Sequence, residues 1–130
     1  MAAVTTFEIH ASDPAACIAF YEAAFGWEFV EHKFGDTSYW EIRSGEAEPR
    51  GAMGRMICRH GNPPADGAPV MGAVITVDLD DLDAAFAAAL ANGGVEAMAK
   101  FAIPDIGWVA YVKDPDGNVL GLFQSDGGAA

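Results

Sequence analysis

The chain has 130 residues, of which 52% are hydrophobic and 20% charged, the size and composition of one globular domain. Nineteen acidic residues against seven basic ones give a formal net charge of −12. This balance excludes nucleic acid and anionic membranes as expected partners, because clustered Lys and Arg bind phosphate. No apolar run reaches the roughly 18 residues of a membrane span. The N-terminus lacks a secretory signal, and Cys17 and Cys58 lack disulfide or zinc spacing, so a cytoplasmic protein is expected.

The first half of the chain predicts a strand, a helix and three further strands. Residues 5–10 alternate polar and apolar side chains, as a half-buried strand does. Asp13 and Pro14 suit the cap and the first position of a helix, which Gly26 ends. Strand-like stretches follow at 27–34, 37–43 and, more weakly, 51–59.

The second half repeats this order. Its predicted strand, helix and three strands cover residues 70–78, 81–91, 95–102, 107–113 and 118–124. Asp13 aligns with Asp81 and Gly26 with Gly94, although identity between the halves is thin. The sequence therefore predicts an α+β fold with two βαβββ modules, at 1–59 and 70–124. The Pro- and Gly-rich segment 60–69 is the expected linker, and residues 125–130 are expected to form a flexible tail.

Two motifs resemble one known family. The segment from Phe7 to Pro14, followed by FYxxxFGW at 20–27, resembles the opening of the vicinal oxygen chelate superfamily of glyoxalases, bleomycin-resistance proteins and extradiol dioxygenases. The segment KDPDGNVLGLF at 113–123 resembles its last hairpin. The resemblance implies two modules that curl into open cups around a cavity, a lyase-like or dioxygenase-like activity, and a homodimer.

Metal-dependent members of this family hold their ion with side chains at set places. By the resemblance, these places fall on Thr6, Val74 and Gly121, with a fourth near Met53 in the strand at 51–59. Thr, Val and Gly thus stand where the family has His, His and Glu. Divalent ions need imidazole or carboxylate donors, so no cofactor is expected and a divalent metal is disfavoured.

Glu8 and His10 are the candidate catalytic residues. Side chains alternate across a strand, so Thr6, Glu8 and His10 share one face, which should line the cavity. An imidazole titrates near neutral pH, so the pair could act as a base and the group that orients it. The alternative is that His10 lies at the strand end and bonds only to backbone or water.

A candidate binding pocket combines apolar and aromatic side chains with a few polar groups, which is typical of small-molecule sites. Its predicted lining residues are Thr6, Tyr39, Trp40, Val74, Thr76, Trp108, Gly121 and Phe123. The same aromatics could instead serve core packing alone. A glycine inside a strand, as at Gly121, often marks the close approach of a ligand or another backbone.

Three functions remain open from the sequence. The leading prediction is a metal-free cup that binds a small organic molecule, either to sequester it or to act on it with Glu8 and His10. The second is a divalent-metal-dependent lyase, isomerase or dioxygenase with non-standard ligands such as Glu8, His10 and Asp78. The third is a dimeric module without catalytic activity, whose partner is a protein.

Overall fold

A computed structural model describes residues 6–44, 53–70 and 72–130. The first module contains β1 (Thr6–Ala11), α1 (Pro14–Phe25), β2 (Glu28–Phe34), β3 (Thr37–Arg43) and β4 (Met53–Cys58). The second contains β5 (Ile75–Asp78), α2 (Leu82–Ala91), β6 (Val95–Ile103), β7 (Gly107–Lys113) and β8 (Val119–Ser125). The expected positions Thr5, Gly51 and Ala52 lie outside the described residues. Among the described helices, none is both long and apolar enough to cross a membrane.

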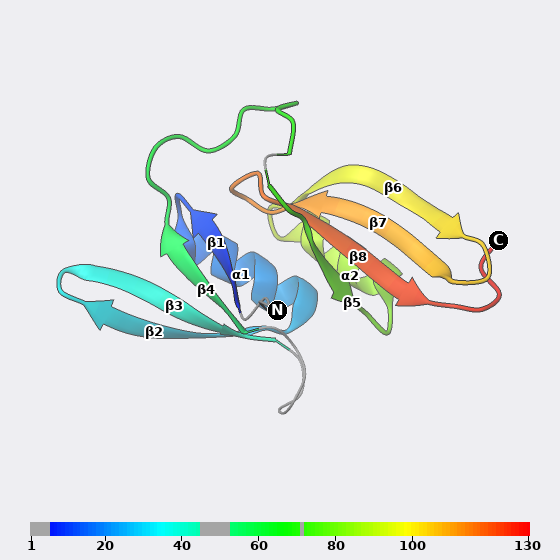
Figure 1. The fold of residues 1–130 in the computed structure, drawn as a ribbon, viewed down its shortest axis with the longest axis horizontal. Helices are drawn as coiled ribbons and strands as arrows, with labels where there is room; N and C mark the ends of the chain where they lie inside the picture. Colours follow the sequence, from blue (N-terminus) through cyan, green and yellow to red (C-terminus); the bar gives the residue numbers. More distant parts are fainter. Residues whose placement is uncertain (1–5, 45–52, 71) are drawn as a thin grey trace, which may run out of the picture.

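Each module forms one four-stranded sheet, and the two helices lie between the sheets (Figure 1). The strand orders are β1-β4-β3-β2 and β5-β8-β7-β6. In each sheet the first strand runs parallel to the last, and the other neighbours are antiparallel. The predicted α+β fold of two βαβββ modules is therefore confirmed.

Side-chain caps start both helices where the sequence predicts. The backbone N–H of Ala16 donates to the Asp13 carboxylate at 3.2 Å, and that of Ala84 donates to Asp81 at 3.0 Å. Gly26 ends α1 with a φ of 68°, a left-handed conformation that glycine adopts at no steric cost. These signals are local in the sequence, which is why the helices could be predicted.

The core lies against the helices, and α1 contacts α2. An aromatic cluster joins α1 to the start of β2, where the Tyr21 and Trp27 rings stack with centroids 5.1 Å apart. Cys17 belongs to the same buried surface, and burial raises the pKa of its thiol to about 12. The thiol is therefore protonated at neutral pH and packs as a small apolar group.

Two segments differ from the sequence prediction. The strand expected at 70–78 begins only at Ile75, because the Pro- and Gly-rich character of the linker continues past residue 70. The expected tail makes contacts in the structure. Trp108 Nε1 donates to Asp126 at 2.9 Å, and the carbonyl oxygen of Ala129, which is buried, accepts from the N–H of Asp105 at 3.0 Å. The polar groups of Asp126 thus join the C-terminal turn to β7.

The hairpin between β7 and β8 joins the two modules. The Asp116 carboxylate accepts hydrogen bonds from the backbone N–H of Ser12 at 2.8 Å and from Arg59 Nε. Asn118 Nδ2 donates to the carbonyl oxygen of His10 at 2.9 Å, and Arg59 Nη2 donates to Asn118 Oδ1 at 2.9 Å. We call Ser12, His10, Arg59, Asp116 and Asn118 the clasp. The turn expected at 114–117 therefore does more than connect two strands, because polar groups of this hairpin bind the first module.

A buried carboxylate supports the clasp from beneath. Tyr21 Oη donates to Asp114 at 2.7 Å, and Asn118 donates to Asp114 from its backbone N–H at 2.9 Å and from Nδ2 at 2.8 Å. Burial raises the pKa of Asp114, although these hydrogen bonds oppose the rise. Burial and the Asp114 charge raise the pKa of Tyr21 well above its ordinary value, so the phenol stays a donor. The hydrogen bond therefore ties α1 to the hairpin.

We expect Asp116→Asn to destabilise the protein more at neutral than at acidic pH. Burial acts to raise the pKa of Asp116, but hydrogen bonds from Arg59 and Ser12 outweigh it and lower the pKa. The stabilisation is therefore complete above the ordinary value of 3.8 and is lost as the pH falls through the folded-state pKa. Breaking a buried ion pair should lower the free energy of unfolding at neutral pH by about 3 kcal/mol.

Urea unfolding of wild type and variant at pH 7 and near pH 3 measures this difference. Asp83→Asn is the control, because Asp83 forms an ion pair with Lys100 at 3.1 Å but its side chain is 74% exposed. This variant should change the free energy of unfolding by less than about 1 kcal/mol. If Asp116→Asn lowered the free energy of unfolding equally at both pH values, the charged role assigned to Asp116 would be wrong.

Candidate functional site

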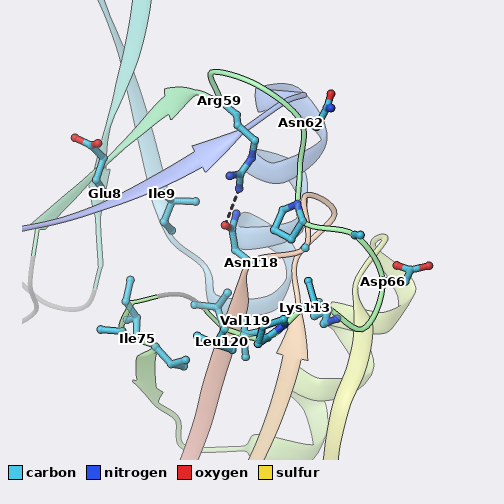
Figure 2. A pocket seen from close by; sticks show the side chains of 18 of the residues that line it. Glu8, Ile9, Arg59, Asn62, Asp66, Ile75, Lys113, Asn118, Val119 and Leu120 are labelled. Atoms are coloured by element: carbon cyan, nitrogen blue, oxygen red, sulfur yellow. Dashed lines mark hydrogen bonds between the residues drawn. The ribbon is translucent and has the colours of Figure 1, made fainter.

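A cavity of about 600 Å³ lies between the two modules. It is bounded by β1, α1, the segment between β4 and β5, and the β7–β8 hairpin (Figure 2). This volume is within the range of small-molecule binding sites. Because the clasp joins the same elements, it holds the walls of the cavity in place.

The walls of the cavity are mainly apolar. Side chains of the strands and the linker supply this surface, namely Ile9, Pro64, Ala68, Pro69, Val70, Val74, Ile75, Val119 and Leu120. Polar groups come from Tyr21, Arg59, Asn62, Lys113 and Asn118. Figure 2 shows the Arg59 guanidinium reaching across to Asn118, while the carboxylates of Glu8 and Asp66 point away from that contact.

The structure brings the two candidate catalytic residues together. His10 Nε2 and Glu8 Oε1 are 2.9 Å apart, and the two side chains are 42% and 43% exposed. Glu8 borders the cavity, whereas His10 contributes its backbone carbonyl to the clasp, accepting from Arg59 at 3.2 Å and from Asn118. The imidazole therefore faces solvent with its carboxylate partner and does not line the cavity.

The predicted binding residues lie in the cavity, on the sheet faces that point away from the helices, or on the helix side of the sheets. Of these residues, Val74 lines the cavity. Thr76, Gly121 and Phe123 share the face of the second sheet that points away from α2, because they alternate with the buried Leu120 and Leu122. Thr6 shares the corresponding face of the first sheet with Glu8. Tyr39 lies there too, with its ring stacked on His32 at 5.2 Å. These residues lie on two open sheet faces and not in the cavity.

Trp40 and Trp108 lie on the helix side of their sheets. Trp40 pairs with the fully buried Met56 and packs against the core. Trp108 pairs with Gln124, whose side chain accepts from the N–H of Leu82 at the start of α2, and it also packs against the core. Side chains alternate across a strand, so both tryptophans point toward the helices and not toward the open sheet faces. The prediction that they line the same pocket as Thr6 and Gly121 is therefore wrong.

Gly121 shows which close approach requires a glycine. A Cβ atom at this position would lie 2.7 Å from Thr76 Oγ1 and 3.2 Å from Tyr111 Cε1. Neighbouring side chains on the same face therefore account for the glycine, and its strand position does not by itself indicate a ligand.

The positions that the resemblance assigns to a metal do not suit a divalent ion. Thr6 lies opposite Met53 in β4, which gives the register of the fourth place. A Thr hydroxyl, a Val side chain and a Gly provide no imidazole or carboxylate. Across 6–44, 53–70 and 72–130, no three His, Cys, Asp or Glu residues gather closely enough to hold a metal, so Asp78 does not complete a site with Glu8 and His10.

Apart from Glu8, the polar residues of the cavity are not among the predicted site residues. Tyr21 and Asn118 belong to the two family-like motifs, which we interpreted as core and turn. Arg59 and Lys113 carried no spacing signal. A usable signal was the concentration of polar residues in a hairpin of 114–118, which needs buried partners when it meets another module.

Solved structures with this fold come from several bacteria. A glyoxalase/bleomycin resistance protein from Albidiferax ferrireducens is 23% identical with a TM-score of 0.66, and the match covers 95% of this chain and 98% of that one. A glyoxylase/bleomycin resistance protein/dioxygenase domain from Frankia sp. is 15% identical with a TM-score of 0.72, covering 97% and 99% of the chains. A lactoylglutathione lyase from Agrobacterium tumefaciens is 20% identical with a TM-score of 0.63, covering 95% and 94%. These similarities show the fold.

Sequence comparison agrees with the fold. The "Putative glyoxylase CFP32" proteins of Mycobacterium tuberculosis and Mycobacterium bovis are 27% identical over 120 residues, which are 92% of this chain and 44% of the relatives. The chain thus spans less than half the length of these relatives. A family model covers residues 3–122, and this match identifies the chain as a member of the Glyoxalase/Bleomycin resistance protein/Dioxygenase superfamily.

Proposed function

We propose that this protein binds a small, partly apolar organic molecule in the cavity between its modules, without a metal ion. The observation that carries the proposal is the cavity of about 600 Å³, whose apolar walls surround a few polar groups. Such a composition suits small ligands, because apolar contact supplies affinity and the polar groups fix orientation.

The donor chemistry supports a metal-free site. Superfamily membership alone does not separate binding from catalysis, since the family description includes glyoxalases, dioxygenases and resistance proteins. In this chain, Thr6, Val74 and Gly121 occupy the places that would need strong metal donors. Sequestration of a ligand needs none of them.

A metal-free proton transfer is the second candidate, and the Glu8–His10 contact of 2.9 Å favours it. A carboxylate that accepts from an imidazole can orient the ring for proton transfer. Glu8 also borders the cavity, so a ligand there would lie next to the carboxylate that holds the imidazole. This reaction would add to binding and would not replace it.

We expect the purified protein to contain less than about a tenth of an equivalent of any divalent metal, since its donor set is weak. Plasma mass spectrometry measures this after purification without chelator and again after dialysis against nickel, zinc, iron and manganese. Near-stoichiometric metal that is lost on His10→Ala would overturn the metal-free proposal. It would support a metal-dependent lyase, isomerase or dioxygenase with non-standard ligands.

Filling the cavity should abolish ligand-induced stabilisation. Ala68 lines the cavity from an exposed position in the linker, so Ala68→Trp adds an indole there with little cost to the core. A ligand at 100 times its dissociation constant stabilises the folded state by about 2.7 kcal/mol. In a thermal-shift screen of partly apolar drugs and metabolites with chelator present, at least one compound should raise the Tm of wild type but not of Ala68→Trp.

Ala87→Trp is the matched control, because Ala87 is an exposed residue of α2 that does not line the cavity. This variant should respond to the compound as wild type does. A screen without any hit would contradict the proposal, as would a hit that stabilises Ala68→Trp equally.

The expected homodimer, the cytoplasmic location and the absence of nucleic-acid and membrane partners remain predictions. Light scattering of the full chain would test the dimer directly. A monomer with an intact ligand response would separate the cavity from the oligomeric state, because all residues named as its lining belong to one chain.

A further inference from the structure

Two cations line the cavity of a strongly acidic protein. The chain has seven basic residues against nineteen acidic ones, yet both Arg59 and Lys113 border this space. We propose that the ligand of the cavity is an apolar molecule that ends in an oxyanion, with Lys113 Nζ and Arg59 Nη1 as the partners of that group. The inference rests on the proposed function and adds the chemical class of the ligand.

The Lys113 ammonium has no ion-pair partner among the described residues. The other two lysines form ion pairs, Lys33 with Glu31 at 3.2 Å and Lys100 with Asp83 at 3.1 Å. Within the part of the chain that the structure describes, no hydrogen bond or ion pair engages Lys113 Nζ. The residue is half-buried at the end of β7 and borders the cavity. An anion in the cavity would supply an acceptor for this ammonium.

Arg59 offers a second donor in a fixed orientation. A guanidinium carries five N–H donors. Nε donates to Asp116, and Nη2 donates to the His10 carbonyl oxygen at 3.2 Å and to Asn118 Oδ1 at 2.9 Å. Nη1 has no acceptor among the described residues, although the side chain is 15% exposed. Because the clasp already orders this side chain, binding an oxyanion costs little additional conformational entropy.

The acidic residues that border the cavity do not neutralise the positive charge of Lys113. The Glu8 carboxylate contacts His10 at 2.9 Å, and Asp66 points away from Arg59 and Asn118 in Figure 2. Asp116 compensates the charge of Arg59, which leaves Lys113 as the uncompensated cation among the described residues that line the cavity. The apolar surface of Ile75, Val119 and Leu120 lies beyond these donors and suits a hydrocarbon body.

A series of octyl compounds tests the head group while the apolar body stays constant. Octanoate, octyl phosphate, octanol and octylamine are titrated into the full chain by calorimetry at neutral pH with chelator present. We expect either anion to bind at least roughly ten-fold more tightly than octanol, because a hydrogen bond to a charged group adds about this factor. Octylamine should bind more weakly than octanol. The two anions distinguish a carboxylate from a phosphate ligand.

Lys113→Gln should reduce the preference for the anions over octanol by roughly ten-fold, measured as the ratio of the dissociation constants within each variant. Lys33→Gln is the control, since it changes the net charge equally but lies on β2, away from the lining residues. Its preference should equal that of wild type. Retention of the full preference in Lys113→Gln would overturn the inference, as would equal loss in both variants.

The outcomes separate this inference from the proposed function. If octanol or a neutral compound of the screen binds wild type and not Ala68→Trp, while the anions bind no better, the oxyanion inference is wrong and the binding function stands. If no compound distinguishes wild type from Ala68→Trp, both are wrong. Tight anion binding that Ala68→Trp does not weaken would place the anion site elsewhere and overturn the inference.

Discussion

The buried ion pair between Arg59 and Asp116 is the interaction on which the arrangement of the modules depends. Its side chains are 15% and 5% exposed, so both charges have left most of their water. Such burial is costly unless the remaining donors and acceptors are also satisfied. Asn118, Ser12 and the His10 carbonyl provide these partners for all of these groups except Arg59 Nη1. The requirement is directional, and it therefore selects one arrangement of the modules where apolar packing alone would tolerate several.

The cavity follows from this arrangement. The linker leaves β4 directly beside Arg59 and crosses to β5, while the hairpin approaches from the second sheet (Figure 1). Tyr21 and Asp114 support the hairpin from the core, and the described side chains leave no buried polar atom without a partner. These directional contacts thus fix the relative positions of the elements that border the cavity.

The elements could be predicted because their signals are local. The Asp13 cap accepts from a backbone N–H only three residues away, and strand alternation repeats every two residues. The cavity depends on partners that are far apart in sequence, with 93 positions between Tyr21 and Asp114 and 57 between Arg59 and Asp116. No periodicity links such residues. The strand register alone determines on which side of the sheet Trp40 and Trp108 lie. The prediction placed them in the pocket because they are aromatic and did not apply the alternation of side chains.

The two modules of the repeat differ in the sequence of the hairpin that forms the clasp. By the alignment of Asp13 with Asp81, the clasp hairpin at 114–118 corresponds to Glu46-Ala47-Glu48-Pro49-Arg50, which has neither its glycine nor its asparagine. A duplicated module begins with two equivalent loops, and here the sequence of only one of them contains the aspartate, glycine and asparagine of the clasp hairpin. Asp116 and Asn118 hold the modules together, and Asn118 also lines the cavity, so sequence change in this one hairpin would alter both at once. The architecture and the cavity are thus under a shared constraint within one short segment of the chain.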